Sequence, residues 1–349
     1  MAVLFGGRSG EHEVSLRSAA SVTATLARHH DVLPILIDHQ GRWLLQPSGT
    51  AQPTGGTAVF VVPGPHDRGH LRRLTDASVA AEPDVYFPLV HGTFGEDGTL
   101  QGLLELVGLP YVGAGVLGSA AGMDKAAMKA LFTHAGLPLG PYRVLRGRDA
   151  LAEQDALAAL GLPVFVKPAN MGSSVGISKV CTQEEFSAAL GKALDYDHKL
   201  VVERAIDARE IEVSVLGGED PEVSVPGEVV PDREFYDYDS KYAAKSATRL
   251  LIPAALDSPL MERARALARQ AFLAIDGYGF ARVDLFLERG SARLLVNEIN
   301  TIPGFTSISM FPKLWEASGR SSVELVARLV QLAIERHARR SSLRTEQQP

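Results

Sequence analysis

Four polar side chains alternate with apolar residues in two β-rich runs near the end of the sequence. Arg282 and Asp284 lie two residues apart in the first run, and Glu298 and Asn300 lie two residues apart in the second. A turn at 289–290 separates the runs, so we predict an antiparallel hairpin. Because side chains two residues apart on a strand point to the same face, each polar pair shares a face.

Three of these four side chains offer oxygen ligands. Buried carboxylates are costly without a counter-charge, so the group calls for a cation. Oxygen ligands are typical of Mg²⁺ or Mn²⁺ sites, and Mg²⁺ is usually shared with substrate phosphates. The pattern alone leaves two interpretations open: a metal site for a nucleotide, or a solvated face with an ion pair between Arg282 and Asp284.

A glycine- and serine-rich loop follows the predicted strand 164–167. Lys167 ends this strand, and the loop Gly172–Gly176 precedes the predicted strand 177–180. Such a loop can offer backbone N–H groups to phosphate oxygens while the lysine neutralises charge. A hairpin turn with an incidental lysine explains the same residues, so this segment alone does not decide between them.

Two other nucleotide motifs carry little weight. GxxxxGK[ST] is absent, and the GxGxxG at 113–118 has no acidic residue about 20 positions further on. We interpret 113–118 as a flexible link between domains.

Ionisable side chains follow two of the predicted strands of the first domain. His91 follows the predicted strand 85–90, at the carboxyl end where ligands bind in open parallel sheets; a glycine-rich turn before a helix is a compatible alternative. Glu11 and Glu13 open the predicted helix 13–28. Acidic residues stabilise a helix start, which explains one of them, and the second could bind a substrate ammonium.

The elements that position these residues begin with a βαβ unit. Strand 2–5, helix 13–28 and strand 32–37 predict a parallel sheet that 85–90 extends. Residues 41–80 look like a hairpin and loop insertion. Further elements are predicted at the following positions: helix 123–135, strand 200–203, strands 211–216 and 223–230, a helix from Ser258, and a closing helix 323–334 with a capping box of Ser321 and Glu324.

The predicted fold class is α/β and α+β. The length of 349 residues exceeds one typical core and predicts two or three domains. We divide the chain into three, at 1–113, 114–203 and 204–349. The tail after Arg336 is predicted to be a frayed end.

Composition restricts the class of protein. The net charge of −6 gives no footprint for nucleic acid, and no run reaches the roughly 20 apolar residues that cross a bilayer. The first residues lack the features of a signal peptide. Cys181 is the only cysteine, which excludes an internal disulfide and fits a reducing cytoplasm.

Together these segments resemble the D-alanine:D-alanine ligases of the ATP-grasp superfamily. The resemblance runs in order through nearly the whole chain. Its motifs are GGRSGEHEVSL, HGTFGEDGTLQG, YVGAGVLGSAAGMDK, VKPANMGSSVGIS, FYDYDSKY, GFARVDLF and NEINTIPGFTS. The resemblance implies a three-domain ATP-grasp architecture and ATP-dependent joining of two D-alanines through a D-alanyl phosphate, for peptidoglycan precursor synthesis.

The resemblance also implies residue roles on the nucleotide side. Asp284, Glu298 and Asn300 would hold two Mg²⁺ or Mn²⁺ ions. The residues expected to contact ATP are Lys125, Lys167, Glu203, Arg204, Glu210 and Lys241. The family often has Glu-Lys where this chain has Glu203-Arg204, so the contact of Arg204 departs from the pattern.

On the substrate side, the resemblance implies that Glu11 binds the first D-alanine ammonium with the help of Ser173 and Tyr242. Ser309 would receive the second carboxylate, with His91 near that substrate. Arg282 and the Gly304 N–H would face the developing oxyanion. The loops 235–249 and 172–176 are candidate lids. A homodimer and K⁺ activation are further expectations from the family.

Three alternatives stay open. A related ligase could use D-serine or D-lactate as second substrate, although Tyr242 argues against lactate. Another ATP-grasp carboxylase or carboxylate–amine ligase would share the hairpin but would not explain HGTFGEDGTLQG. A non-enzymatic nucleotide sensor would need a broken metal site.

Overall fold

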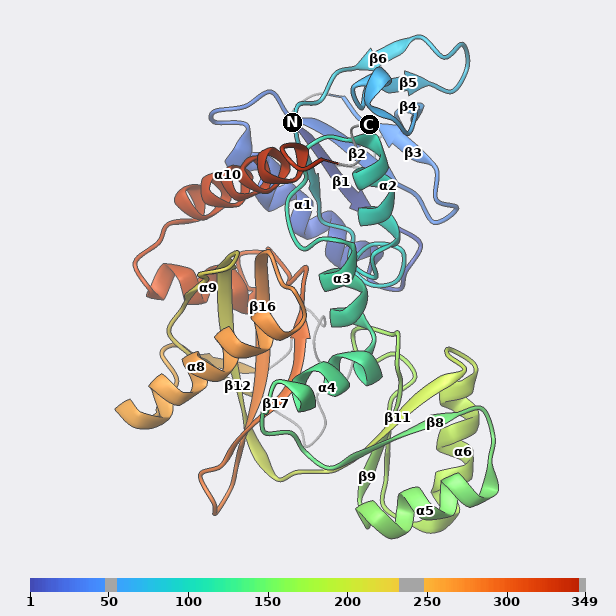
Figure 1. Cartoon of the computed structure of the whole chain (residues 1–349), viewed down its shortest axis with the longest axis vertical. Coiled ribbons are helices and arrows are strands. Elements are labelled where there is room, and N and C mark those ends of the chain that lie inside the picture. The colour runs from blue at the N-terminus through green and yellow to red at the C-terminus, as the bar shows by residue number, and fades with distance from the viewer. Residues whose placement is uncertain (48–54, 232–247, 345–349) are drawn as a thin grey trace.

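Three separate β-sheets organise the chain, and helices run between them (Figure 1). The structure is a computed structural model, and it describes residues 1–47, 55–231 and 248–344. Tyr242 and Lys241 therefore lie outside the described residues, together with most of the predicted lid 235–249.

The first sheet has seven strands. They are β1 (Ala2–Gly6), β2 (Leu33–Ile37), β3 (Trp43–Leu45), β4 (Thr57–Val61), β5 (Leu71–Arg73), β6 (Val79–Ala81) and β7 (Tyr86–Pro88). β1 pairs in parallel with β2 and β7, which confirms the predicted parallel unit. The predicted insertion at 41–80 is wrong in part: β3 to β6 continue the same sheet as antiparallel strands, and Val59 and Leu71 are buried in its core.

Helices α1 (His12–Leu26) and α2 (Thr99–Val107) belong to this first unit, with a short 3₁₀ turn η1 (Pro65–Asp67) beside α2. The last helix, α10 (Ser322–Ser341), packs against α1 although it ends the chain (Figure 1). Its start carries the predicted capping box of Ser321 and Glu324.

The predicted frayed tail after Arg336 is wrong, because α10 continues to Ser341. The Arg336 side chain is buried and donates from Nη1 to the Gly113 carbonyl at 2.9 Å. Its guanidinium also lies 4.0 Å from the centre of the Tyr111 ring. These contacts tie the last helix to the first sheet.

The segment 113–118 is part of a packed helical connection and not a flexible link. Helix α3 (Val116–Met123) starts within it, and α4 (Lys125–His134) follows directly. Small residues are needed here because a Cβ on Gly279 would lie 2.9 Å from the Gly113 Cα. Asp124 caps α4 by accepting hydrogen bonds from the Ala126 and Ala127 N–H groups at 3.0 Å.

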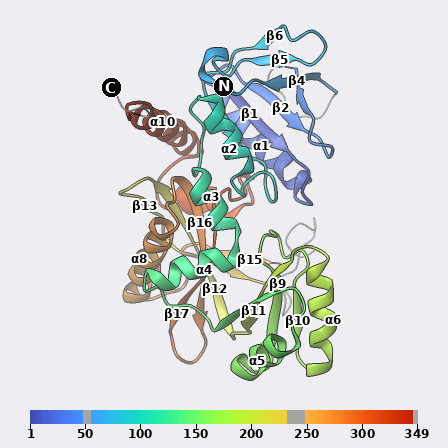
Figure 2. The ribbon, with the colours of Figure 1, turned by 45° about the vertical axis from the view of Figure 1, so that its right-hand side comes forward.

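The second sheet has four strands, β8 (Tyr142–Arg146), β9 (Val164–Pro168), β10 (Ser178–Val180) and β11 (Lys199–Arg204), all antiparallel, in the order β10-β9-β11-β8. Helices α5 (Ala150–Leu160) and α6 (Gln183–Leu194) cover it (Figure 2). Apolar residues from both helices and the strands form one core cluster.

The third sheet is also antiparallel and contains β12 (Ala208–Gly217), β13 (Glu222–Val223), β14 (Gly227–Val230), β15 (Arg249–Leu251), β16 (Gly279–Glu288) and β17 (Leu294–Asn300). Helix α8 (Ser258–Ala274) packs against β12, β16 and β17, and α9 (Met310–Ala317) packs against β12. A mixed α/β sheet with a parallel β2-β1-β7 core, followed by two antiparallel α+β units, confirms the predicted fold class.

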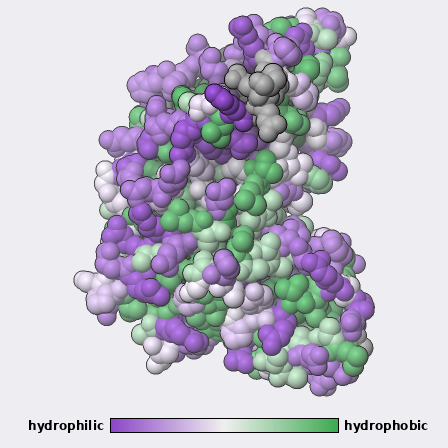
Figure 3. Space-filling model, viewed as in Figure 1, coloured by the Kyte–Doolittle hydropathy of each residue, from purple (hydrophilic) through white to green (hydrophobic). Residues whose placement is uncertain are grey.

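The surface gives two smaller results. No helix among the described ranges is both long and apolar enough to cross a membrane. The face in Figure 3 is mainly hydrophilic, with hydrophobic residues gathered over α2 and α3, where Leu106, Val116 and Leu117 are exposed. Cys181 is a free, exposed thiol.

Candidate active site

The polar hairpin forms as predicted. In the β16–β17 register, Arg282 lies opposite Asn300 and Asp284 lies opposite Glu298. Val283 and its partner on β17 are buried on the other face. Four polar side chains therefore share one face of two adjacent strands.

Arg282 neutralises part of this face. Its Nε and Nη2 donate to the two Asp284 carboxylate oxygens at 2.7 Å each, and Nε lies 3.1 Å from Glu212 Oε2. Burial alone would lower the pKa of Arg282, but Asp284 and Glu212 outweigh it and raise that pKa. The ion pair of the second interpretation is thus present, and it stabilises the face without a metal.

The same face also fits a divalent cation chemically. Asp284 and Glu298 are like charges directly opposite each other on neighbouring strands, an arrangement that is unfavourable without a nearby cation. The donors are all oxygen atoms, as Mg²⁺ prefers. Across the described part of the chain, no three His, Cys, Asp or Glu side chains cluster as a metal site. The predicted set has two carboxylates and an amide, so the metal assignment stays a prediction.

A buried cluster of two lysines and one glutamate lies beside the hairpin. Lys167 Nζ donates to Glu203 Oε2 at 3.1 Å, and Lys129 Nζ lies 3.3 Å from Glu203 Oε1. Burial alone would raise the pKa of Glu203, but the two ammonium groups outweigh it and hold that pKa below its usual range. Burial would lower the pKa of Lys167, yet Glu203 and Glu298 raise it. Burial lowers the pKa of Lys129, and the Glu203 carboxylate opposes that shift. Lys167 and Glu203 are therefore held in their charged forms.

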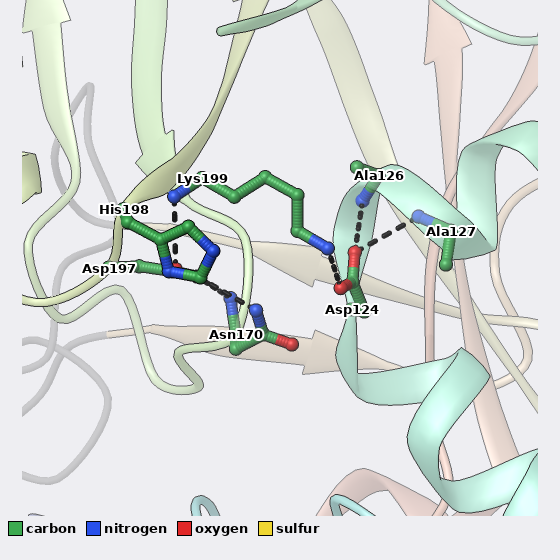
Figure 4. A network of polar contacts seen from close by, with 7 residues as sticks. All are labelled: Asp124, Ala126, Ala127, Asn170, Asp197, His198 and Lys199. Carbon is green, nitrogen blue, oxygen red and sulfur yellow. Dashed lines mark hydrogen bonds and ion pairs between the residues drawn. The ribbon is translucent and has the colours of Figure 1, made fainter. Parts of the chain in front are cut away.

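A network of charged and amide groups holds the start of α4 beside Lys199, the first residue of β11 (Figure 4). Lys199 forms an ion pair with the cap residue Asp124. Asp197 accepts hydrogen bonds at 2.8 Å from the Asn170 backbone N–H and side-chain amide. Lys125 is consequently held against the loop 170–176, where its Nζ donates to the Met171 carbonyl at 2.6 Å.

Glu11 meets the serine loop across the domain boundary. The Ser173 hydroxyl donates to the Glu11 carboxylate, although 162 residues separate them. Gly92 and Gly172 enclose that carboxylate, because a Cβ at either position would lie within 2.7 Å of Glu11 Oε2. Ser173 itself has a φ of 48°, in the left-handed region that a serine rarely adopts.

His91 is part of a hydrogen-bonded bridge to the loop after β17. Its Nδ1 donates to the Ile302 carbonyl at 2.8 Å, since that oxygen can only accept. Burial lowers the pKa of His91, so the ring is neutral and its Nε2 accepts from the Ser18 hydroxyl at 3.1 Å. Ser18 Oγ in turn accepts from the Phe305 N–H at 3.2 Å. Both ring nitrogens are thus used to position the loop 302–305.

Glu96 is a second carboxyl close to Glu11. It is buried and accepts a hydrogen bond from the Gly92 N–H at 2.7 Å. Burial, reinforced by the Glu11 charge, raises the pKa of Glu96 to about 8. Glu96 is therefore protonated at neutral pH.

Gly304 and Ser309 lie together at the start of α9. Ser309 is its N-cap residue, and its Oγ lies 2.7 Å from Thr306 Oγ1 and accepts from the Thr306 N–H at 3.1 Å. A Cβ on Gly304 would lie 2.9 Å from Ser309 Oγ. A hydroxyl, a backbone N–H and a helix start therefore converge at one place.

Two residues that are predicted to contact the nucleotide, Arg204 and Glu210, have contacts with other parts of the protein. Arg204 is exposed, and its Nε donates to the Leu160 carbonyl at 2.6 Å. Glu210 lies on β12 opposite Phe286 of β16 and Val229 of β14. Both roles stay predictions.

Sequence reasoning missed four members of the site: Ser18, Glu96, Lys129 and Glu212. Glu96 lies inside the quoted motif HGTFGEDGTLQG, and Lys129 is four residues after Lys125, on the same face of the predicted helix. Glu212 alternates with Glu210 on a predicted strand. These signals exist in the sequence, but a motif or a shared face does not say which charge pairs with which.

Comparison with known proteins defines the class and then the family. The fold is the ATP-grasp fold, shared with a solved D-alanine–D-alanine ligase and a solved D-Ala:D-Ser ligase. Models described as "D-ala D-ala ligase N-terminus" and "D-ala D-ala ligase C-terminus" match residues 1–114 and 131–331. The chain belongs to the D-alanine–D-alanine ligase family.

Similar proteins span the full length. A D-alanine–D-alanine ligase from Heliobacterium modesticaldum is 50% identical, over 100% of this chain and 98% of its own. The structure of the Coxiella burnetii D-alanine–D-alanine ligase has a TM-score of 0.85 and 38% identity, over 97% of this chain and 96% of its own. The structure of a D-Ala:D-Ser ligase from Enterococcus faecalis has a TM-score of 0.86 and 33% identity, over 95% of this chain and 98% of its own. The fold therefore does not separate the two acceptors.

Proposed function

We propose that this protein joins two D-alanine molecules into D-alanyl-D-alanine, converting ATP to ADP and phosphate, for peptidoglycan precursor synthesis. The observation that carries this proposal is the contact between Glu11 and Ser173. It brings a carboxylate that can bind an ammonium group next to the loop whose Met171 carbonyl accepts from Lys125. Family membership over the whole chain supports the same reaction.

On the substrate side, the ionised Glu11 carboxylate binds the ammonium of the first D-alanine. Ser173 orients that carboxylate, and Tyr242 is a further proposed member of the group. With its pKa raised to about 8, Glu96 adds no second negative charge beside Glu11 at neutral pH. Ser309 and Lys241 receive the carboxylate of the second D-alanine, and His91 holds the loop that carries this pocket.

On the nucleotide side, Lys125 and Lys167 contact phosphates, and Glu203 and Glu210 contact adenine and ribose. Asp284, Glu298 and Asn300 would hold divalent cations, Mg²⁺ or Mn²⁺, which neutralise phosphate charge when bound. Arg204 follows Glu203 directly in the sequence, and we propose that it also contacts the nucleotide. We place the nucleotide between the units 114–203 and 204–349, and D-alanine between 1–113 and 204–349.

The reaction needs two displacements. A carboxylate oxygen of the first D-alanine attacks the γ-phosphorus, and the bond to the β,γ-bridging oxygen breaks, giving D-alanyl phosphate and ADP. The uncharged amine of the second D-alanine then attacks the carbonyl carbon, and a C–N bond forms. The bond from that carbon to the phosphate oxygen breaks, phosphate leaves with the electron pair, and the nitrogen releases one proton. Phosphorylation is required because a free carboxylate would have to expel oxide.

This chain's residues act mainly through charge placement. The lysines neutralise the transferring phosphoryl group, and Arg282 with the Gly304 N–H stabilises the tetrahedral oxyanion. The Gly172–Gly176 loop is the proposed lid that excludes water from the acyl phosphate. We further propose a homodimer in the cytoplasm, the compartment that supplies ATP, and activation by K⁺.

Phosphate release tests the proposal. We expect release from ATP to require D-alanine, and L-alanine to be inactive because its methyl group would point away from the pocket. Glu11→Gln should lower release by about 10²-fold, whereas the exposed Glu13→Gln should not. Release that is independent of D-alanine, or equal with L-alanine, would refute the proposal.

A second acceptor deserves the same assay. The likeness to a D-Ala:D-Ser ligase makes D-serine the strongest alternative second substrate. Mixed reactions of D-alanine with D-serine or D-lactate, resolved by mass spectrometry, distinguish the products. A dominant D-alanyl-D-serine product at equal concentrations would move the assignment to that acceptor.

A further inference from the structure

Lys129 is the most deeply buried lysine of the described site, with a side chain only 2% exposed. Its Nζ lies 3.3 Å from Glu203 Oε1 and donates to the Asn297 carbonyl at 3.2 Å. The Tyr142 ring lies 5.6 Å from the same nitrogen. One ammonium group thus connects α4, β11 and the residue directly before Glu298 on β17.

Glu203 contacts two lysines, and only one of them, Lys167, is proposed to contact the ATP phosphates. Its Oε2 accepts from Lys167, and its Oε1 faces Lys129. Under the proposed function, Lys167 turns to the ATP phosphates, so Glu203 loses that partner. A carboxylate with 10% exposure cannot remain ionised at low cost unless another cation stays beside it.

We propose that Lys129 is a positioning residue for nucleotide recognition: it keeps Glu203 ionised and oriented, and anchors the backbone beside Glu298, when Lys167 engages the phosphates. Burial lowers the pKa of Lys129, but the Glu203 carboxylate 3.3 Å away opposes that shift, and Lys129 in turn lowers the pKa of Glu203. The inference rests on the nucleotide site of the proposed function.

The charge of Glu203 has a consequence for base choice. Adenine offers an exocyclic amino donor where guanine offers a carbonyl acceptor. An ionised carboxylate can only accept, so it favours adenine, whereas a protonated carboxyl can also donate to guanine. Lys129 therefore acts on ATP-over-GTP preference through Glu203, which a purely structural lysine would not do.

The test measures ADP and GDP binding with Mg²⁺ by isothermal titration calorimetry. Lys129→Met removes charge and donor, and Lys129→Gln keeps a donor for Asn297 O. We expect both to weaken ADP binding about tenfold and to lower the ADP-to-GDP affinity ratio by a similar factor. Lys192→Met, on the outer helix α6, is the matched control and should leave both affinities unchanged.

A double-mutant cycle shows whether Lys129 acts through Glu203. In a Glu203→Gln background, Lys129→Gln should change ADP binding less than threefold, because the carboxylate is already gone. Steady-state kinetics should show a raised KM for ATP, with kcat at saturating ATP altered much less. Circular dichroism spectra and thermal midpoints of all variants record whether the fold persists.

Several results would overturn the inference. They are an unchanged ADP-to-GDP ratio in both Lys129 variants, an equal loss of both nucleotides, or full additivity with Glu203→Gln. Wild-type protein that binds ADP but releases no phosphate with D-alanine contradicts the proposed function and leaves the Lys129 measurement valid. Wild-type protein that binds no nucleotide overturns both.

Discussion

The surroundings of Glu11 and the surroundings of Glu203 are both buried and polar, yet different interactions stabilise them. Around Glu11, hydroxyls, backbone groups and the neutral His91 ring form hydrogen bonds that reach the loop after β17. Glu96 adds a carboxyl that is protonated at neutral pH. Around Glu203, the amino groups of Lys129 and Lys167 lie 3.3 and 3.1 Å from the two carboxylate oxygens.

The difference shows which of the two groups already has its interactions in place without substrates, and which group would exchange ionic partners when substrates bind. On the proposed D-alanine side, hydrogen bonds between protein groups join Glu11 to Ser173 and His91 to the loop after β17. On the nucleotide side, ion pairs such as Arg282–Asp284 and Lys167–Glu203 hold charges that a phosphate or metal would claim. Exchange of one ionic partner for another avoids leaving a buried charge unpaired.

The largest expected effect comes from removing a charge on the proposed nucleotide side. Glu298→Gln should lower D-alanine-dependent phosphate release by roughly 10³-fold, because one of the two metal-ligand carboxylates is lost. The fold should persist, since the change removes one of two opposed carboxylates on β16 and β17. Glu288→Gln, at the turn end of the same hairpin and 29% exposed, should retain activity. Retained turnover in Glu298→Gln would refute the metal assignment.

A smaller effect tests the neutral side through pH. The raised pKa of Glu96, about 8, means that the folded protein holds a proton that the unfolded chain loses near pH 4.5. Its contribution to stability is fully present below pH 4.5 and is lost as pH rises through 8. Glu96→Gln should remove this dependence, and we expect it to gain on the order of 2–3 kcal/mol relative to wild type between pH 5.5 and 8.5.

Thermal and urea unfolding at several pH values measure that gain. Glu13→Gln, an exposed acid-to-amide change on α1, controls for general charge effects and should follow the wild-type curve. If the Glu96→Gln and wild-type curves run parallel across this range, Glu96 is ionised in the fold, and the contrast between the two sides fails.

The smallest expected effect sharpens the account of the hydrogen-bonded bridge. Ser18→Ala leaves His91 Nε2 without its donor and the Phe305 N–H without its acceptor. We expect a loss of about 1–2 kcal/mol in the free energy of unfolding and a raised KM for the second D-alanine, with the KM for ATP unchanged. Ser21→Ala on the same helix is the control, and equal KM changes for both substrates would contradict a local role.

Much of the fold was predictable because it depends on local pattern. Alternation over 280–300 predicted the β16–β17 hairpin and its shared faces, and the capping box at Ser321 predicted the start of α10. The pattern failed where tertiary packing outweighs local preference. The small residues of 113–118 look flexible, yet close contact of Gly113 with Gly279 packs them beside helix α3.

The site divides in the same way. The sequence by itself determined the residue types: acidic and amide oxygens on one strand face, a lysine before a glycine and serine loop, and an acidic helix start. Only the tertiary structure decided their partners, such as Ser173 for Glu11 across 162 residues and Ile302 for His91 across 211. The physical reason is that alternation and caps act between neighbours in the chain, whereas desolvation acts between groups that folding brings together. Lys129 shows this most clearly, because burial beside Glu203 made an unremarked helix lysine part of the site.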